Sequence, residues 1–301
     1  MFKLKLAEVK DLPLQAVLYG LPCSGKSTAL GTFGKTTLIL HTAEEAHGAR
    51  AAIKIAAARY PGVIVHPINI SIKDATDVEL GLFSEKTPTA LTPDLMWDKL
   101  LFYIKNAPEG VGAIGVDSLT EIFRFIKESK AFIRLCTQSG DKGASYNKWL
   151  ERSAYISMLH TLVAELEIKR SLGVDIVCTI AGKGVYNEIG EMISLVPDLP
   201  MFGLAEDTVK TFSDILPVHR RAVITSTGDT AEHVVFDMNM IVGKVQKTEK
   251  GVLKNSFRSF GRLSSLEATV PFGAVIDYLP VDFNNLKSNI ETLLGDDNTE
   301  E

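Results

Sequence analysis

The sequence predicts an α/β fold in which a mostly parallel central sheet is flanked by helices and followed by a β-rich C-terminal extension. Short apolar runs rich in β-branched residues alternate with amphipathic stretches, which is the pattern of a parallel sheet covered on both faces. A glycine-rich turn joins the first such run to the first helix. The 301 residues are 46% hydrophobic and 23% charged, which excludes collagen-like, disulfide-stapled and wholly disordered classes.

The expected elements follow one another along the chain. Apolar, β-branched runs predict strands at residues 15–19, 36–42, 63–70, 111–117, 175–181 and 223–227. Apolar residues at helical spacing predict helices at residues 26–33, 44–59, 93–106, 119–135 and 146–170. Trp97 and Trp149 lie in two of these helices and are predicted to be core residues.

Three segments follow neither pattern, namely residues 73–92, 137–145 and 182–203. They are rich in Gly, Pro, Ser, Thr or charge, and long loops within a compact domain are usually functional or mobile. We expect four parts in the chain: an N-terminal segment (1–13), a core (14–233), a C-terminal extension (234–290) and an acidic, disordered tail (291–301).

Charge and cysteine usage exclude further classes. The 32 Lys and Arg against 37 Asp and Glu give a net charge of -5, so a globally basic nucleic-acid binder is not expected, although a local basic patch is compatible. Cys23, Cys136 and Cys178 are widely spaced, which argues against a disulfide framework and a structural zinc site. With no apolar targeting segment and no run of about 18 apolar residues, we expect a soluble cytoplasmic protein with no membrane partner.

Residues 20–27 read Gly-Leu-Pro-Cys-Ser-Gly-Lys-Ser and match the P-loop pattern G-x-x-x-x-G-K-[ST]. The glycines let the backbone turn its N–H groups toward a phosphate, Lys26 meets the β and γ phosphates, and Ser27 supplies a hydroxyl to Mg²⁺. The alternative is a glycine-rich turn with an exposed lysine. The residues expected to bind ATP are Gly20, Leu21, Pro22, Cys23, Ser24, Gly25, Lys26, Ser27 and Thr28.

A carboxylate is expected near this Mg²⁺ at the end of a buried strand. The apolar run 111–117 ends in Asp117, which fits the role of holding the metal through its water shell. Alternatively, Asp117 or Ser118 caps the helix that follows.

Hydrolysis also needs a group that orients or deprotonates water. Glu44 and Glu45 follow the strand 36–42, whose end we expect beside the P-loop strand at the carboxyl edge of the sheet. Glu44 is the preferred catalytic base. The alternative is that both are first-turn acids favoured by the helix dipole.

Taken together, these residues resemble the RecA-like branch of the P-loop ATPases, and within it the small phage-encoded, AAA-labelled ATPases related to single-strand annealing recombinases. Leu38-Ile-Leu-His-Thr-Ala-Glu44-Glu45 is similar to the strand that ends in that family's catalytic glutamate, and Val116-Asp117-Ser118 is similar to its Walker B strand. The resemblance covers about residues 14–250. It implies a RecA-like P-loop NTPase fold, Glu44 as the base, ATP and Mg²⁺ as ligands, and a phage-encoded protein in the bacterial cytoplasm.

The resemblance further implies that two loops, 137–147 and 182–203, line a central DNA channel. The chain departs from RecA proteins at Thr179-Ile-Ala-Gly-Lys183, where the family carries an Asn-Gln pair that senses the γ-phosphate, and Lys183 is a candidate substitute. The side chains expected to contact single-stranded DNA are Lys142, Lys148, Lys183 and Tyr186.

A homo-oligomer, either a ring or a filament, with ATP sites at subunit interfaces is also implied. Residues 242–250 resemble the region of trans-acting lysines, so Lys244 and Lys247 are expected to act in catalysis at a neighbouring site.

The expected function is that of an ATP-hydrolysing, DNA-binding enzyme in recombination, single-strand annealing or replication. A single-strand-binding or replication protein is an expected partner. The alternatives are a nucleotide-switched adaptor, such as a helicase loader, and a small-molecule P-loop kinase. Kinases of that kind tend to carry an arginine-rich lid, and residues 182–203 contain no arginine.

Overall fold

The computed structural model describes residues 13–140, 143–190, 192–200, 212, 214–224, 230–236, 246–247, 253–254, 279–280 and 282–284. In some strands, including all those after residue 213, only the backbone is described. Residues 1–12 of the predicted N-terminal segment and the whole predicted acidic tail lie outside the described residues. Within the ranges given, no helix is long and apolar enough to span a membrane.

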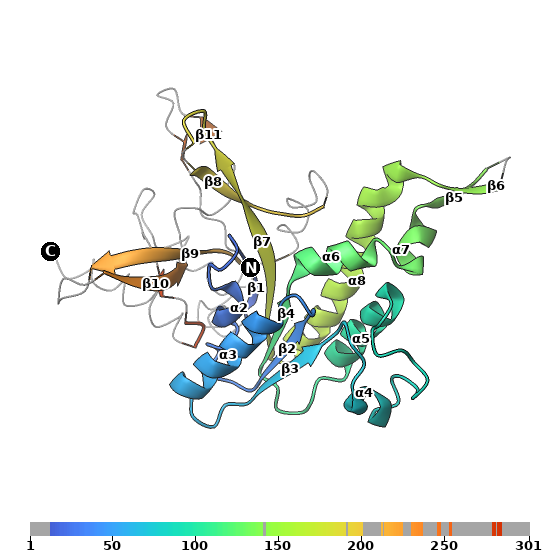
Figure 1. Cartoon of the computed structure of the whole chain (residues 1–301), viewed down its shortest axis with the longest axis horizontal. Helices are drawn as coiled ribbons and strands as arrows, with labels where there is room; N and C mark the ends of the chain where they lie inside the picture. Colours follow the sequence, from blue (N-terminus) through green and yellow to red (C-terminus); the bar gives the residue numbers. More distant parts are fainter. Residues whose placement is uncertain are drawn as a thin grey trace, which may run out of the picture.

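A mostly parallel sheet forms the centre of the molecule (Figure 1). Its parallel strands lie in the order β3 (Val65–Asn69), β2 (Thr37–His41), β4 (Ala113–Asp117), β7 (Asp175–Tyr186), β1 (Gln15–Gly20) and β9 (Asp214–Ile224). Three strands add antiparallel pairs: β8 (Met192–Pro197) on β7, β10 (Thr230–Phe236) on β9, and β13 (Leu279–Pro280) on β10. The predicted α/β fold with a mostly parallel sheet is confirmed.

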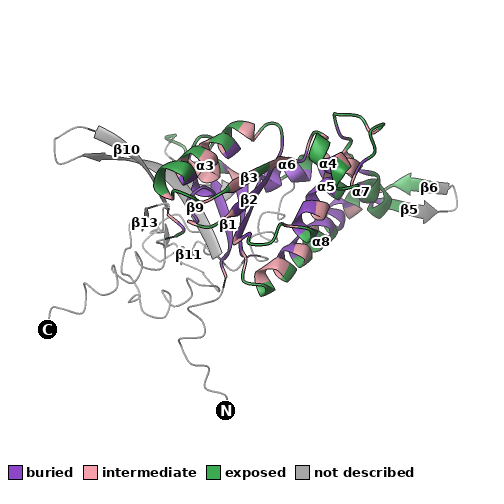
Figure 2. Ribbon diagram, turned by 90° about the horizontal axis from the view of Figure 1, so that it is seen from below, coloured by how far each residue is buried: buried purple, intermediate pink, exposed green. Residues whose placement is uncertain are grey.

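Helices cover both faces of this sheet (Figures 1 and 2). One face carries α2 (Lys26–Ala29) and α3 (Ala46–Arg59), and the other carries α5 (Pro93–Lys105), α6 (Leu119–Ile126) and α8 (Glu151–Ser171). Strand side chains alternate between the faces. Val17 and Tyr19 of β1 join the apolar cluster under α5, α6 and α8, whereas Gly115 of β4 lies against Leu30 on the face of α2. Both layers are thereby anchored to buried strands.

Five of the six predicted strands lie where the sequence placed them, although β7 continues to Tyr186. The sixth was predicted too late in the chain, at 223–227, and is observed as β9 at Asp214–Ile224. Pro217 and the polar run His219-Arg220-Arg221 interrupt the apolar pattern of this strand. The predicted strand therefore overlaps only the apolar C-terminal end of β9, at residues 223–224.

The predicted helix 26–33 is shorter, because regular α-helix ends at Ala29. Beyond it the backbone forms tighter turns, in which Leu30 N donates to Ser27 O and Thr32 N donates to Ala29 O. The Thr32 hydroxyl also donates to Ala29 O at 2.7 Å. This side chain competes for the carbonyl group of the last helical turn.

Two other helix predictions were wrong in extent. The predicted helix 119–135 is divided into α6 and α7 (Lys130–Leu135), because the Ser129 hydroxyl accepts a bond from Phe132 N and caps a new helix. The predicted helix 146–170 begins only at Glu151. A hairpin of β5 (Thr137–Gly140) and β6 (Gly143–Tyr146) and a 3₁₀ turn, η1 (Lys148–Leu150), precede it.

Trp97 is buried in the core as predicted, but the prediction for Trp149 was wrong, since its side chain is 92% exposed. Asn147 is responsible for the difference. Its side chain accepts a hydrogen bond from Trp149 N at 3.0 Å and caps η1, so Trp149 lies in the turn before α8 and not on its packed face.

The predicted loop 73–92 contains α4 (Ala75–Glu79), which is held to α5 by a buried ion pair. Lys99 Nζ lies 2.5 Å from Asp77 Oδ2, and neither side chain is exposed to solvent. Tyr103 donates to Asp77 Oδ1 at 2.8 Å, and Lys99 also donates to Ile72 O at 2.8 Å. Burial of such a pair is tolerated because both partners are also hydrogen-bonded to other groups.

A short segment near the C-terminus, residues 282–284, packs on the end of the α2 turn. The Phe283 ring stacks on Phe33 with centroids 4.6 Å apart, and Asn284 N donates to Thr32 O at 2.9 Å. Tyr60 donates a hydrogen bond to Asp282 at 2.8 Å. Burial, and after it this bond, raises the pKa of Tyr60 to about 12. Residues 282–284 therefore pack against the core.

The Lys99–Asp77 pair yields a stability prediction. Lys99→Met leaves the Asp77 carboxylate buried without its cation, and we expect the free energy of unfolding to fall by about 3–5 kcal/mol in urea titrations. Lys105→Met on the same helix is the control. Lys105 pairs with Glu165 at 3.1 Å but is 51% exposed, so its loss should change stability by at most about 1 kcal/mol. Equal effects of the two variants would contradict this assignment.

Candidate functional site

The predicted site residues meet at the carboxyl edge of the sheet. The glycine-rich loop follows β1, Asp117 ends β4, and Glu44 and Glu45 follow β2. The expectation that β2 lies beside β1 was wrong, because β4 and β7 lie between them. Parallel strands still end at one edge, so the separation leaves all three segments on the same side of the molecule.

The loop between β1 and α2 wraps around Lys26. Lys26 Nζ donates to Gly20 O at 2.9 Å and to Leu21 O at 3.0 Å. Two loop residues have left-handed backbones, Cys23 with φ of 61° and Gly25 with φ of 97°. Burial lowers the pKa of Lys26, while Asp117, Glu45 and Cys23 oppose that shift. The lysine is thus a half-buried cation surrounded by backbone groups of the loop.

Asp117 is a buried carboxylate with only one of its oxygens hydrogen-bonded. Thr179 of β7 donates its hydroxyl hydrogen to Oδ1, whereas Oδ2 is buried and has no hydrogen-bond partner among the described residues. Burial raises the pKa of Asp117, and the hydroxyl groups of Thr179 and Ser27, followed by the Lys26 cation, lower it. Ser27 thus lies close enough to act on the carboxylate, although it forms no hydrogen bond of ordinary geometry to Oδ2. The Asp117–Ser118 peptide is cis. A buried, half-satisfied carboxylate destabilises a fold unless something else binds it.

Ser27 lies beside this carboxylate and packs closely against Gly48. A Cβ added to Gly48 of α3 would lie 2.5 Å from Ser27 Oγ and 3.3 Å from Asp117 Oδ2. Among the described residues, no group of three or more His, Cys, Asp or Glu side chains is arranged to hold a metal by itself. Mg²⁺ in phosphate sites commonly takes only one or two protein oxygens, so Ser27 and the unpaired oxygen of Asp117 fit that ion.

Two further hydroxyl groups around this space have no partner. Ser24 Oγ in the loop and Thr42 Oγ1 after β2 are both buried, and neither forms a hydrogen bond to a described residue. Thr42 lies directly beside Asp117, since its backbone N donates to Asp117 O at 3.3 Å. Unsatisfied buried groups are rare in folded proteins, and a cluster of them indicates a place where a polar ligand binds.

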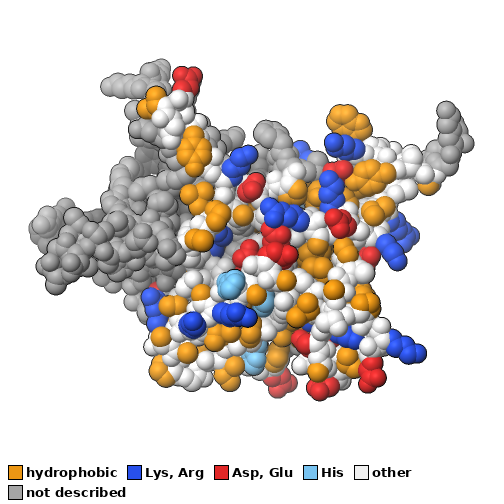
Figure 3. Space-filling view, viewed as in Figure 1, with side chains coloured by type: hydrophobic (Ala, Val, Ile, Leu, Met, Phe, Trp, Pro, Cys, Tyr) orange, Lys and Arg blue, Asp and Glu red, His pale blue; other side chains and the backbone are white. Residues whose placement is uncertain are grey.

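Of the two glutamates after β2, Glu45 faces the site. Ser118 donates to Glu45 Oε1 at 3.4 Å. Burial and the neighbouring Asp117 raise the pKa of Glu45, while Lys26 lowers it. The preferred candidate, Glu44, is exposed. Glu121 of α6 lies near both glutamates, since burial raises its pKa and Glu44 and Glu45 raise it further. Figure 3 shows acidic side chains gathered near the middle of the face.

Strand β7 leads from the site to a projecting hairpin. Thr179 binds Asp117, Ala181 lies opposite Gly20 in the strand register, and β7 then continues to pair with β8 beyond the body of the sheet (Figure 1). The predicted loop 182–203 is therefore a hairpin over residues 182–197. Lys183 and Tyr186, two of the proposed DNA contacts, are exposed on β7.

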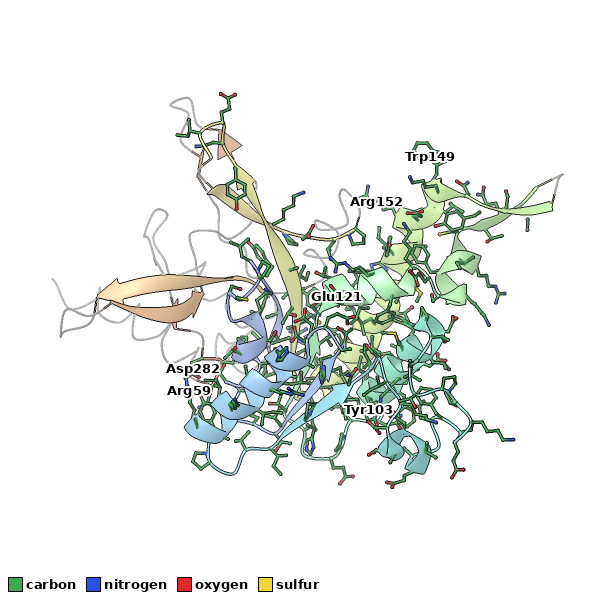
Figure 4. All side chains as sticks on the ribbon, in the orientation of Figure 1. Arg59, Tyr103, Glu121, Trp149, Arg152 and Asp282 are labelled. Carbon is green, nitrogen blue, oxygen red and sulfur yellow. The ribbon has the colours of Figure 1, made fainter. Side chains whose placement is uncertain are left out.

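A second hairpin, β5–β6, occupies the predicted loop 137–147 and also extends away from the body. Lys148 is exposed just after it, and the Trp149 side chain points outward at the start of α8 with Arg152 nearby (Figure 4). Tyr146 is 47% exposed and donates to Glu151 at 2.8 Å. Cationic and aromatic side chains are therefore grouped at the base of this hairpin.

Some predicted residues are not placed. Lys142 and Lys244 lie outside the described residues. Lys247 belongs to β11 (Gln246–Lys247), a strand paired with β12 (Leu253–Lys254) and described only as backbone. The roles assigned to these three lysines stay predictions.

Three contributions to the site were missed from the sequence. Gly48 could have been found as an isolated glycine inside a helical pattern, which marks a close approach. Thr179 gave no signal, because a threonine in an apolar strand is ordinary. His41 lies opposite Asp117 in the sheet, and burial lowers the pKa of its ring. Its Nδ1 lies 2.8 Å from Thr42 O.

The chain matches no protein-family model, and a search of curated proteins finds no significant match. The interpretation of the site therefore depends on its own residues and geometry.

The half-satisfied carboxylate yields a pH-dependent prediction. Because the folded pKa of Asp117 is raised above its unfolded value, its ionisation destabilises the fold at neutral pH and this effect disappears on acidification below the unfolded pKa. We expect Asp117→Asn to raise the free energy of unfolding at neutral pH by about 1–3 kcal/mol, with a smaller gain at acidic pH. Urea titrations at both pH values measure it.

Asp175→Asn provides the matched control. Asp175 is also buried and is the first residue of the central strand β7, but its oxygens accept hydrogen bonds from Leu14 N at 2.7 Å and Lys35 Nζ at 2.6 Å. Loss of its charge should therefore lower stability. A stability loss of similar size in Asp117→Asn would contradict the half-satisfied state of Asp117.

Proposed function

We propose that the protein is a RecA-like P-loop ATPase that binds ATP with Mg²⁺ and couples its hydrolysis to single-stranded DNA in recombination, annealing or replication. The observation that carries the proposal is the unpaired oxygen of Asp117, which faces Ser27 and lies near the lysine of a glycine-rich loop. A cation and a hydroxyl at the end of the loop after β1, opposed by a carboxylate at the end of β4 two strands along the sheet, form the constellation that phosphoryl transfer requires.

Nucleotide binding follows from the loop itself. In the proposed complex, Lys26 exchanges its bonds to Gly20 O and Leu21 O for contacts with phosphate oxygens. Ser27 and Asp117 would hold Mg²⁺, which would supply positive charge to the phosphates. The hydrogen bond from Thr179 leaves Oδ2 of Asp117 as the oxygen available to the hydrated ion.

Glu45 is the proposed catalytic base. It is part of the same charged network as Lys26 and Asp117, and its raised pKa brings it closer to the operating pH of a general base. Ser118 holds its carboxylate at 3.4 Å. Glu44 is exposed and forms no hydrogen bond to the described residues of the site, so it is the less favoured of the pair.

Single-stranded DNA is the proposed second ligand, bound by the two hairpins. Such ligands need cations that follow the phosphates and aromatic surfaces for the bases. Lys148 and Trp149 by one hairpin and Lys183 and Tyr186 on the other supply both, and all four are exposed. Because Thr179 and Lys183 share β7, a shift at the nucleotide site can reach the β7–β8 hairpin along one strand.

An oligomer is proposed because phosphoryl transfer needs more positive charge than the described residues of the site supply. Within the described residues, Lys26 is the only cation that acts on both Asp117 and Glu45. Phosphoryl transfer usually requires further positive charge, which Lys244 or Lys247 of a neighbouring copy would supply. Exposed acidic side chains near the site, such as Glu44, would attract the basic segment 242–250 of a neighbouring copy.

ATP hydrolysis with and without single-stranded DNA tests the function. We expect DNA-stimulated turnover in the native protein and none in Lys26→Ala. Glu45→Gln should retain ATP binding but lose turnover by about 10²–10⁴-fold, because it removes the base and keeps the shape of the site. Glu44→Gln is the matched control and should keep most of its turnover. The reverse ranking of the two glutamine variants would move the base to Glu44.

Transfer of phosphate to a small molecule without DNA stimulation would instead indicate a kinase, and dependence on a protein partner would indicate an adaptor. Each outcome contradicts the proposed function in a different way.

Trp149 tests the DNA surface. Trp149→Ala should weaken binding of a fluorescent single-stranded oligonucleotide by about 1–3 kcal/mol, because each stacked base contributes that much. Fluorescence anisotropy measures the affinity. Leu172→Ala is the control, since Leu172 is 73% exposed but lies just beyond the other end of α8. Equal affinities for native protein and Trp149→Ala would remove this residue from the DNA surface.

A further inference from the structure

One of the three cysteines lies inside the proposed phosphate-binding loop. Cys23 is exposed, whereas Cys136 and Cys178 are buried. Burial keeps reagents away from Cys136 and Cys178. It also raises the pKa of both thiols, which keeps them protonated. Cys23 is therefore the thiol that a reagent in solution can reach in the folded chain.

The backbone fixes Cys23 at the turn of the loop. Its φ of 61° is a left-handed conformation that few residues other than glycine adopt. Ser24 N donates to Leu21 O at 3.1 Å and closes the turn around it. Cys23 is also close enough to Lys26 to influence its pKa. A group attached to the Cys23 sulfur would therefore lie beside the lysine that binds phosphate.

Independent evidence indicates that this place is a ligand site. Within the described part of the chain, Ser24 Oγ, in the next residue, and Asp117 Oδ2, beside Ser27, are both buried and have no hydrogen-bond partner. Buried polar atoms in this state are expected where a polar ligand binds. The exposed thiol thus lies one residue from such an atom.

We infer that Cys23 is a redox modification site at which a low-molecular-weight disulfide blocks access of the triphosphate to the loop. The inference rests on the nucleotide binding proposed above. The Cys23 sulfur, as thiolate, attacks one sulfur of the disulfide. A new S–S bond forms, the old S–S bond breaks, and the other half leaves as a thiolate, while the proton of Cys23 passes to solvent. A second thiol reverses the reaction by the same exchange.

The attached group acts by volume and charge. It fills space at the turn of the loop, and an anionic group also pairs with Lys26 in place of a phosphate. The binding site for the triphosphate is therefore lost while the sheet, whose core lies behind the loop, is retained.

Ellman's reagent, an anionic aromatic disulfide, tests the chemistry because it releases one coloured thiolate for each cysteine modified. The folded protein should release one equivalent rapidly, and the unfolded protein should release three. Cys23→Ser should release none when folded, while Cys178→Ala should still release one. Mg²⁺-ATP should slow the reaction of the native protein by about tenfold or more if bound nucleotide covers the thiol.

Binding of a fluorescent ATP analogue to modified and unmodified native protein tests the consequence. We expect modification to weaken affinity by about tenfold or more and dithiothreitol to restore it. The far-UV circular dichroism of the modified protein should be unchanged. The affinity of Cys23→Ser, whatever its value, should not respond to the reagent.

The possible failures are distinguishable. Equal nucleotide affinity before and after modification overturns the inference and leaves the proposed function intact. Loss of binding together with loss of the circular dichroism signal also overturns it, because the effect would then be unfolding. Absence of nucleotide binding in the unmodified protein overturns the proposed function, and the inference with it.

Discussion

The buried carboxylate of Asp117 is the constraint on which the site depends. The parallel sheet places it at the end of a central strand, where solvent cannot reach it. Thr179 satisfies one oxygen, and the other has no hydrogen-bond partner among the residues that the structure describes. A buried carboxylate in this state destabilises the fold, and the proposed Mg²⁺ would relieve that cost.

The surrounding elements can be understood from this one group. Gly48 is needed because a Cβ there would lie 2.5 Å from Ser27 Oγ and would displace the hydroxyl that is proposed to bind the metal. β7 supplies the hydroxyl that fixes the carboxylate and then continues into an exposed hairpin. The same strand therefore joins the proposed nucleotide site to a proposed DNA contact, without the amide pair that RecA proteins use for that purpose.

Sequence alone could predict the parts of the fold governed by local pattern. The strands β1, β2 and β4 are apolar runs with clear ends, and the glycine-rich loop carries its own motif. Strand order was not predictable, because the insertion of β4 and β7 between β1 and β2 depends on long-range pairing. Trp149 was misplaced for a local reason, since the Asn147 cap moves the start of α8 past it. Thr179 and Glu45 could be recognised as site residues only from the structure, because their interactions with Asp117 distinguish them.

A crystal structure with Mg²⁺ and a non-hydrolysable ATP analogue tests the central claim most directly. The account predicts phosphate density against Lys26 and the loop backbone, and a hydrated metal ion between the Ser27 hydroxyl and the free oxygen of Asp117. An Asp117 carboxylate that still lacks a ligand, with nucleotide absent or bound elsewhere, would contradict it.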